Sequence, residues 1–366
     1  MTAPGQLTLD RTLDGVGLAE VGEVARRAED DGAGGLWLSE IGNDPFLPLA
    51  PAALATARVE LGTSVAIAFA RTPMTVAMTA HELQRASRGR FVLGLGTQVR
   101  AHVTRRFGMP WSQPAARMAD FVQALHAIWD AWNGGGPLEH NGPFYQHTLM
   151  PPMFRPPAHD FGRPKVLIAG VGPRLVRVGS EVGDGVFVHA FASPLYYREV
   201  IEATVRDGLA ASGRGRAEIT VAGAQLVATG PDGRAIDAAA QAARRQVAFY
   251  ASTPAYAGVL AAHGWDDLQP RLAALVRDGR WDELDSLVSD EVLQAFVLVG
   301  PPAEVGAQLR ERWLGMVDRV CLVAPGGVSD ADWRAVHAGL HAAQQTELHT
   351  EMRTEMHTEA RAEARA

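Results

Sequence analysis

The chain has 366 residues, 47% of them hydrophobic and 20% charged, a balance typical of a globular protein long enough for one α/β barrel or two smaller domains. Its formal net charge of −7 gives no electrostatic support for binding nucleic acid. A single cysteine, no apolar leader and no uncharged run of about 20 residues predict a protein without intramolecular disulfides or membrane spans, located in the cytoplasm.

The first half of the chain alternates between short apolar runs and segments with apolar residues at helical spacing. An apolar run at 6–10 predicts the first strand, and the spacing over 16–31 predicts a helix that ends at Gly32. The same patterns recur up to residue 132. They predict strands at 36–40, 59–69 and 91–96, and helices at 45–57, 73–87 and 115–132.

The alternation continues in the second half of the chain. Eight strands that alternate with helices are typical of a parallel barrel rather than of an open sheet. The expected fold is therefore of class α/β, a single (β/α)8 TIM barrel over residues 1–345. The elements expected here are strands at 166–169, 186–189, 219–228 and 320–323, and helices at 173–182, 195–212 and 332–343.

Three segments depart from this rhythm. Segment 133–163 is rich in Gly and Pro and joins a helix to a strand, so it is expected at the N-terminal end of the barrel. Segment 232–300 is too long for one barrel helix and is interpreted as a helical excursion near strand seven. It either overhangs the active face, through Tyr250, Tyr256, His263 and Trp265, or pads the outside of the barrel. The end of the chain, 346–366, repeats Thr-Glu pairs and predicts a disordered low-complexity tail.

Candidate catalytic groups follow two of the expected strands. Glu40 ends the second strand, and the loop after the fourth strand carries Thr97, Gln98 and His102. In TIM-barrel enzymes, loops at the C-terminal ends of the strands form the active site. The sequence therefore predicts Glu40 and His102 as proton-transfer groups, with a structural ion pair as the alternative role for Glu40.

A third loop indicates anion binding. Gly170, Val171 and Gly172 run from a strand into a helix whose first turn contains Pro173. Backbone N–H groups at such a helix start bind phosphate, although a tight turn alone would explain the same residues. The loop lacks the third glycine of a dinucleotide fingerprint, so a Rossmann site is not expected.

Other chemistries find little support in the sequence. The only lysine, Lys165, precedes a strand at the non-catalytic end of the barrel, which argues against Schiff-base chemistry. His337 and His341 share a helix face, but no HExxH motif surrounds them, so no metal site is expected. Cys321 lies within an apolar run and is expected to be a buried small side chain.

Five sequence pieces occur in a specific order along the chain. Together they resemble the bacterial luciferase-like family of flavin and deazaflavin oxidoreductases, over roughly residues 6–345. The similarity is greatest to the branch that uses the deazaflavin coenzyme F420. The pieces are Leu61–Val65, Arg71 with Pro73, Gly89–Thr97, Ile168–Pro173 and Gly183–Val186.

The resemblance implies a TIM barrel and a set of coenzyme contacts. A non-proline cis peptide bond between Ser64 and Val65 would support the deazaflavin ring. The coenzyme phosphate would lie against the backbone of Gly170, Val171 and Gly172. Thr97 and Gln98 would line the same cleft, and His189 would lie near the coenzyme's tail.

The chain also departs from the family's sugar-phosphate dehydrogenases. Ile41 stands where they carry a histidine base, Val99 where they carry an acid, and Ala192 near their basic phosphate ligand. A sugar-phosphate reaction is therefore disfavoured.

The sequence thus predicts a homodimeric oxidoreductase that transfers hydride between coenzyme F420 and a small organic substrate, with no metal. An FMN-dependent luciferase-like monooxygenase and a non-catalytic coenzyme-binding protein remain as alternatives.

Overall fold

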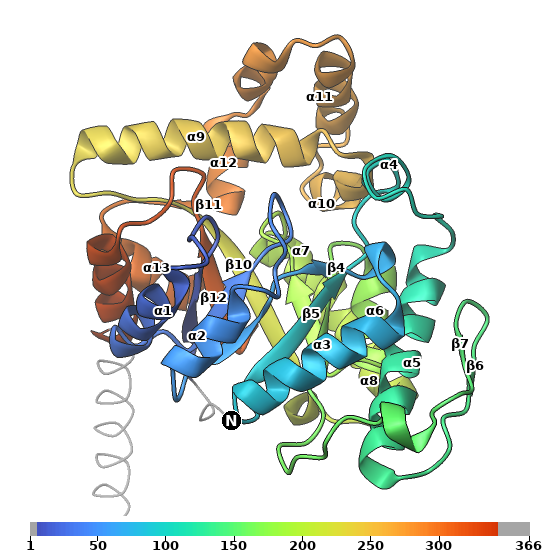
Figure 1. Cartoon of the computed structure of the whole chain (residues 1–366). Helices are drawn as coiled ribbons and strands as arrows, with labels where there is room; N and C mark the ends of the chain where they lie inside the picture. The colour runs from blue at the N-terminus through green and yellow to red at the C-terminus, as the bar shows by residue number, and fades with distance from the viewer. Residues whose placement is uncertain (1–5, 343–366) are drawn as a thin grey trace, which may run out of the picture.

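The computed structural model describes residues 6–342 and contains a closed barrel of eight parallel strands (Figure 1). Closure is complete because β12 pairs with β1, and β10 pairs with both β9 and β12. The predicted TIM barrel is therefore confirmed. In chain order, the barrel strands are β1 (Thr8–Thr12), β2 (Gly35–Leu38), β3 (Glu60–Thr63), β5 (Phe91–Gly96), β8 (Lys165–Gly170), β9 (Gly185–Val188), β10 (Thr220–Ala228) and β12 (Arg319–Val323).

Helices surround the barrel, and the main hydrophobic core lies between them and the strands (Figure 1). Proline occupies the first turn of several of these helices, where its missing N–H costs nothing. The predicted helix 195–212 is a composite, because a π-helical turn at Tyr197–Ile201 separates α7 (Pro194–Tyr196) from α8 (Glu202–Ser212). The outer helices are α1 (Val21–Asp30), α2 (Leu49–Ala55), α3 (Pro73–Ala86), α5 (Pro114–Gly134), α6 (Pro173–Glu181), α8, α13 (Pro302–Trp313) and a helix over 330–342.

A second, smaller core fills the barrel interior. It consists of Trp37, Val92, Leu167, Phe187 and Ala222, each from a different strand. The rings of Trp37 and Phe187 meet edge to face at 5.1 Å. The barrel is thus packed in its middle, which leaves the strand ends for binding.

The predicted strand 59–69 is interrupted rather than continuous. β3 pairs with β2 and β5, and after a break β4 (Ala66–Ile67) pairs with β5 alone. The break contains a cis peptide bond between Ser64 and Val65, as predicted. The loop after β5 also differs from expectation, since it folds into a short helix, α4 (Arg100–Arg105).

Segment 133–163 lies at the end of the barrel opposite α4 and forms a small hairpin of β6 (His140–Asn141) and β7 (Gln146–His147) (Figure 1). The buried carboxylate of Asp120 holds this hairpin. It accepts hydrogen bonds from His140 Nε2 at 2.9 Å and from the N–H groups of Phe144 and Tyr145 at 2.8 and 2.9 Å. The hairpin is thus anchored to α5, the helix that carries Asp120.

The helical excursion crosses the C-terminal end of the barrel (Figure 1). It contains α9 (Gly233–Ala251), α10 (Ala257–Ala261), α11 (Leu268–Arg277) and α12 (Asp290–Phe296). A short strand not predicted from the sequence, β11 (Val297–Val299), then pairs with β10 and returns the chain to the sheet. The sequence left two positions open for the excursion, above the active face or on the outside of the barrel. In the structure it lies above the active face.

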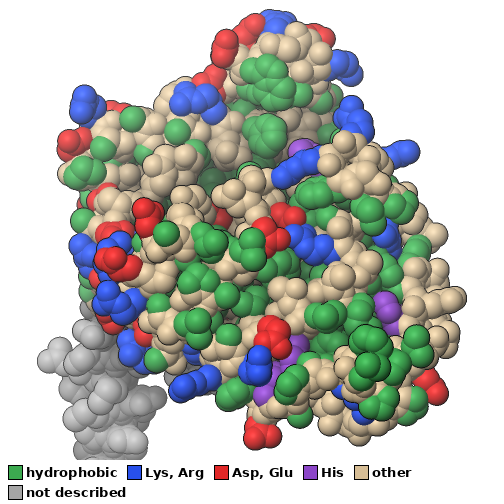
Figure 2. All heavy atoms as spheres, in the orientation of Figure 1, with side chains coloured by type: hydrophobic (Ala, Val, Ile, Leu, Met, Phe, Trp, Pro, Cys, Tyr) green, Lys and Arg blue, Asp and Glu red, His purple; other side chains and the backbone are tan. Residues whose placement is uncertain are grey.

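The surface facing the viewer in Figure 2 interleaves acidic, basic and hydrophobic side chains. No helix among residues 6–342 is long and apolar enough to cross a membrane. The predicted tail, 346–366, lies outside the described residues.

Candidate active site at the mouth of the barrel

A cavity of about 780 Å³ opens where several strands end. Its walls come from the loops after β3, β5, β8 and β9, from the start of α5 and from the excursion. Seven of the eight residues predicted to bind coenzyme line it: Val65, Thr97, Gln98, Gly170, Val171, Gly172 and His189. The eighth, Ser64, does not; its N–H donates to Leu38 O and its carbonyl accepts from Ser39 Oγ.

The glycines of β5 allow the strand to pass close to the cis-bonded segment. A Cβ on Gly94 would lie 1.9 Å from Thr63 O, and one on Gly96 would lie 2.6 Å from Val65 Cγ2. At Gly94 the close atom belongs to the backbone, so only glycine fits there, whereas a Cβ at Gly96 would displace the Val65 side chain. These residues therefore bring Val65 against the end of β5 and shape one wall of the cavity.

Two cavity residues have an unusual backbone. Gln98 has φ 58° and Gln113 has φ 35°, and neither is glycine. Such conformations cost free energy and concentrate at functional sites. Gln98 is held by its own side chain, whose Oε1 accepts from Val99 N at 2.9 Å.

Two helices begin at the cavity. α6 starts at Pro173 after Gly172, and α5 starts at Pro114 after Gln113; neither has a side-chain cap. The first N–H groups of a helix have no partner within it and carry partial positive charge. Residues of both first turns, including Ala115, Ala116, Arg174 and Leu175, line the cavity. The start of α5 and Arg174 were not predicted as site residues, although a proline at each helix start was a visible signal.

His189 presents a neutral ring to the cavity. Its Nδ1 accepts a hydrogen bond from Phe191 N–H at 3.0 Å. Burial lowers the pKa of His189 to about 4. The ring lies against Tyr250 and Tyr256, with centroids 4.8 and 5.1 Å away. Tyr256 itself lines the cavity, so the excursion contributes directly to the site.

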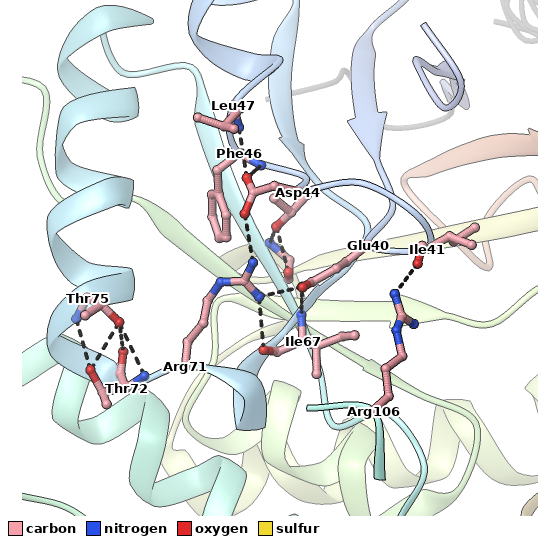
Figure 3. Close-up of polar contacts among 12 residues, drawn as sticks. Glu40, Ile41, Asp44, Phe46, Leu47, Ile67, Arg71, Thr72, Thr75 and Arg106 are labelled. Carbon is pink, nitrogen blue, oxygen red and sulfur yellow. Dashed lines mark hydrogen bonds and ion pairs between the residues drawn. The ribbon is translucent and has the colours of Figure 1, made fainter. Parts of the chain in front are cut away.

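Glu40 is held in an ion pair with Arg71 (Figure 3). It is not among the residues that line the cavity. Its Oε2 accepts from Arg71 Nη1 at 2.6 Å and from Ile67 N–H at 2.7 Å. Arg71 also donates to Asp44 at 3.0 Å. Of the two roles left open for Glu40, this geometry favours the structural ion pair, which fixes β4 beside Val65.

His102 also lies away from the cavity lining. Its side chain is exposed on α4, which is joined to the loop after β2 by a hydrogen bond from Arg106 to Ile41 O (Figure 3). Ile41 and Val99, the two departures from the family pattern, are exposed apolar side chains. The structure therefore does not bring His102 and Glu40 together at the cavity.

The remaining residues considered in the sequence are not among those that line the cavity. His337 and His341 lie 2.9 Å apart through their Nε2 atoms, but no group of three or more metal-ligating side chains occurs within residues 6–342. Cys321 packs against the interior core, and burial raises the pKa of its thiol. Lys165 begins β8, at the end of the barrel opposite the cavity.

Comparisons with known proteins agree with this architecture. The profile of a family described as luciferase-like monooxygenase matches residues 2–319. An uncharacterized protein of Mycobacterium tuberculosis is 47% identical over 303 residues, covering 83% of this chain and 89% of that protein. A putative coenzyme F420-dependent oxidoreductase of the same organism is 30% identical over 310 residues, covering 78% and 85%.

A solved structure shows the same fold. The coenzyme F420-dependent tetrahydromethanopterin reductase from Methanopyrus kandleri superposes with a TM-score of 0.74 at 21% identity, covering 91% of this chain and 97% of that one.

Proposed function

The chain belongs to the luciferase-like monooxygenase family, and from that premise we propose that it binds coenzyme F420 and transfers hydride between the coenzyme and a small organic substrate. The main observation behind this proposal is that Val65, Thr97 and Gln98 line the same cavity as the glycine turn at the start of α6. The relative with 30% identity, a putative coenzyme F420-dependent oxidoreductase, supports the choice of coenzyme.

The residues of the cavity fit such a group. A volume of about 780 Å³ lies within the range of small-molecule and cofactor sites. Val65, Ala169 and Val171 offer an apolar wall for a flat ring. The two helix starts and Arg174 offer N–H groups and positive charge for anionic groups. When bound, the coenzyme supplies the hydride chemistry, and the protein orients it and excludes water.

The protein's own groups have separable roles in this proposal. Glu40 holds β4, and therefore Val65, in place through Arg71 and Ile67. His189 presents a neutral N–H, and Tyr256 closes the wall beside it. Val99, an exposed apolar side chain, lines the cavity where the sugar-phosphate dehydrogenases carry an acid, which favours a substrate other than a sugar phosphate.

A fluorescence titration of the purified protein with coenzyme F420 and with FMN tests the proposal. We expect tighter binding of coenzyme F420. Tight binding of FMN without binding of coenzyme F420 would favour the monooxygenase alternative. Tight coenzyme binding without turnover of any organic substrate would favour the non-catalytic alternative.

Gly172→Ala tests the anion-binding site proposed at the start of α6. A Cβ at Gly172 meets no atom within 4 Å, so the fold should tolerate it while the methyl group occupies space beside the α6 start. We expect Kd for coenzyme F420 to rise about tenfold, equivalent to about 1.4 kcal/mol. The matched control is Gly233→Ala at the start of α9, where an added Cβ also meets nothing; its Kd should equal that of the wild type.

A further inference from the structure

The hydrogen bonding of His189 determines which ring nitrogen carries the proton. Nδ1 accepts from Phe191 N–H at 3.0 Å, so in the neutral ring the proton must be on Nε2. Within residues 6–342, Nε2 has no protein hydrogen-bond partner, and the ring lines the cavity. The side chain therefore offers one fixed, uncharged N–H donor to a bound molecule.

Tyr256 and Tyr250 hold the ring in this orientation. Tyr250 meets it edge to face, with an interplanar angle of 76°, and Tyr256 meets it at 45°. Burial raises the pKa of Tyr256 to about 12, so its hydroxyl remains protonated and neutral. These tyrosines are the titratable groups in ring contact with His189, and neither introduces a charge at neutral pH.

A neutral N–H donor and a positively charged group favour different acceptors. Anionic groups are better stabilised by cations and helix starts, which this cavity provides at Arg174 and at the starts of α5 and α6. A neutral N–H held by aromatic rings is matched instead to a neutral acceptor such as a carbonyl oxygen. His189 therefore differs from the anion-binding side of the cavity.

We propose that His189 and Tyr256 form a carbonyl-recognition pair, in which His189 Nε2–H donates to a carbonyl oxygen of the bound molecule and Tyr256 closes the adjacent wall. The inference rests on the proposed function. The family resemblance implied that His189 lies near the coenzyme's tail. This inference instead assigns it an uncharged oxygen as its partner, which belongs either to the coenzyme's ring or to the substrate. It also makes the excursion, through Tyr256, a determinant of specificity.

Two substitutions at His189 separate the donor from the ring. Glutamine keeps an N–H donor, whereas leucine removes it at similar size. If the carbonyl belongs to the coenzyme ring, His189→Leu should weaken binding of both coenzyme F420 and FMN by about 3- to 10-fold, and His189→Gln should restore most of it. If the carbonyl belongs to the substrate, coenzyme binding stays unchanged, and the loss appears when cyclohexanone is titrated into the coenzyme complex.

Nitrogen-15 NMR of histidine-labelled protein shows directly which ring nitrogen of His189 carries the proton. We expect a protonated Nε2 and an unprotonated Nδ1 at neutral pH, and an Nε2 resonance that shifts with the coenzyme or with cyclohexanone. A charged ring at neutral pH, a proton on Nδ1, or a resonance that neither molecule moves would each overturn the proposal. If the wild type binds neither coenzyme, the proposed function fails; if it binds and these readouts are negative, only this inference fails.

Tyr256→Phe and Tyr256→Ala test the second member of the pair. Phe keeps the ring that holds His189, so the Nε2 resonance should stay close to that of the wild type. Ala removes the wall and should broaden or shift this resonance and weaken ligand binding. Trp281→Ala changes an exposed ring on the same excursion and serves as the control; equal effects of Tyr256→Ala and Trp281→Ala would exclude a specific role for Tyr256.

Discussion

At the scale of single residues, Glu40 shows how the partner of a side chain decides its role. Its side chain is 7% exposed, and its carboxylate accepts hydrogen bonds from Arg71 and from Ile67 N–H. A carboxylate held by a guanidinium and a backbone donor is well suited to positioning and poorly placed to exchange a proton with a ligand in the cavity. The proton-transfer role predicted for Glu40 and His102 therefore remains a prediction without geometric support.

Paired substitutions distinguish the two roles of Glu40. If it positions β4, Glu40→Gln and Arg71→Met should lower stability by similar amounts, about 1–3 kcal/mol, and weaken coenzyme binding together. Thermal unfolding and fluorescence titration measure both effects. Arg27→Met, which breaks an exposed pair with Glu23, is the control and should cost less than about 1 kcal/mol. A loss of turnover in Glu40→Gln alone, with unchanged stability and binding, would restore the proton-transfer role.

At the scale of elements, Glu29 connects α1 to the segment that precedes β3. Its carboxylate accepts from the N–H groups of Arg58 at 2.5 Å and Val59 at 2.7 Å, and also from Ala57 N–H. Burial acts to raise the pKa of Glu29, but these backbone donors and the Arg58 charge outweigh it, so the net pKa is lowered from 4.5. The carboxylate thus stabilises the fold in its charged form.

This arrangement predicts a pH-dependent stability difference. A lowered native-state pKa means that the stabilisation is complete above the unfolded-state value and is lost as pH falls through the native-state value. Glu29→Ala should therefore lower the free energy of unfolding by about 1–3 kcal/mol at neutral pH. The difference from the wild type should shrink below about pH 4.5. Urea unfolding across this range checks it; a constant difference would contradict the assignment.

At the scale of the whole molecule, a buried ionic cluster helps to close the barrel. Arg319 on β12 donates to Asp10 on β1 at 2.6 and 2.8 Å and also contacts Glu60 on β3. Trp37 Nε1 donates to the same Asp10 carboxylate at 2.8 Å. The cluster spans the seam between the first and last strands, so it links distant parts of the sequence.

Removing one partner of this cluster should be costly. Arg319→Met leaves the Asp10 carboxylate, 1% exposed, without its cation, and should destabilise the protein by about 3–5 kcal/mol. The double variant Asp10→Leu/Arg319→Met removes both charges and should lose less than the sum of the two single variants. Denaturant unfolding of all four proteins measures this; additive losses would exclude coupling between the two residues.

We also propose that the protein forms a homodimer. Leu149, Met153 and Phe154 are 76%, 83% and 68% exposed, and Figure 2 shows hydrophobic side chains gathered at the lower right of the molecule. Apolar surface of this kind marks interaction sites. Sedimentation velocity should give a dimer, and Met153→Glu/Phe154→Glu should shift it toward the monomer. A monomer at every concentration would refute the proposal.

The amino-acid sequence by itself determined the alternation of strands and helices and the loops that carry site residues. Strand β5 and the start of α6 were predicted to the residue, because apolar runs, glycines and prolines act on near neighbours. The cavity residues Thr97, Gln98, Gly170 and His189 were also predicted, since strand ends meet at one end of a barrel.

Only the tertiary structure decided which of these groups face the cavity. Glu40 turns to Arg71, His102 lies on an exposed helix, and Tyr256 reaches His189 from the excursion. The starts of α5 and α6 line the same cavity. Such convergence depends on barrel closure and on which charged or aromatic partners lie nearby in space, and these long-range contacts leave no periodic signal in the sequence.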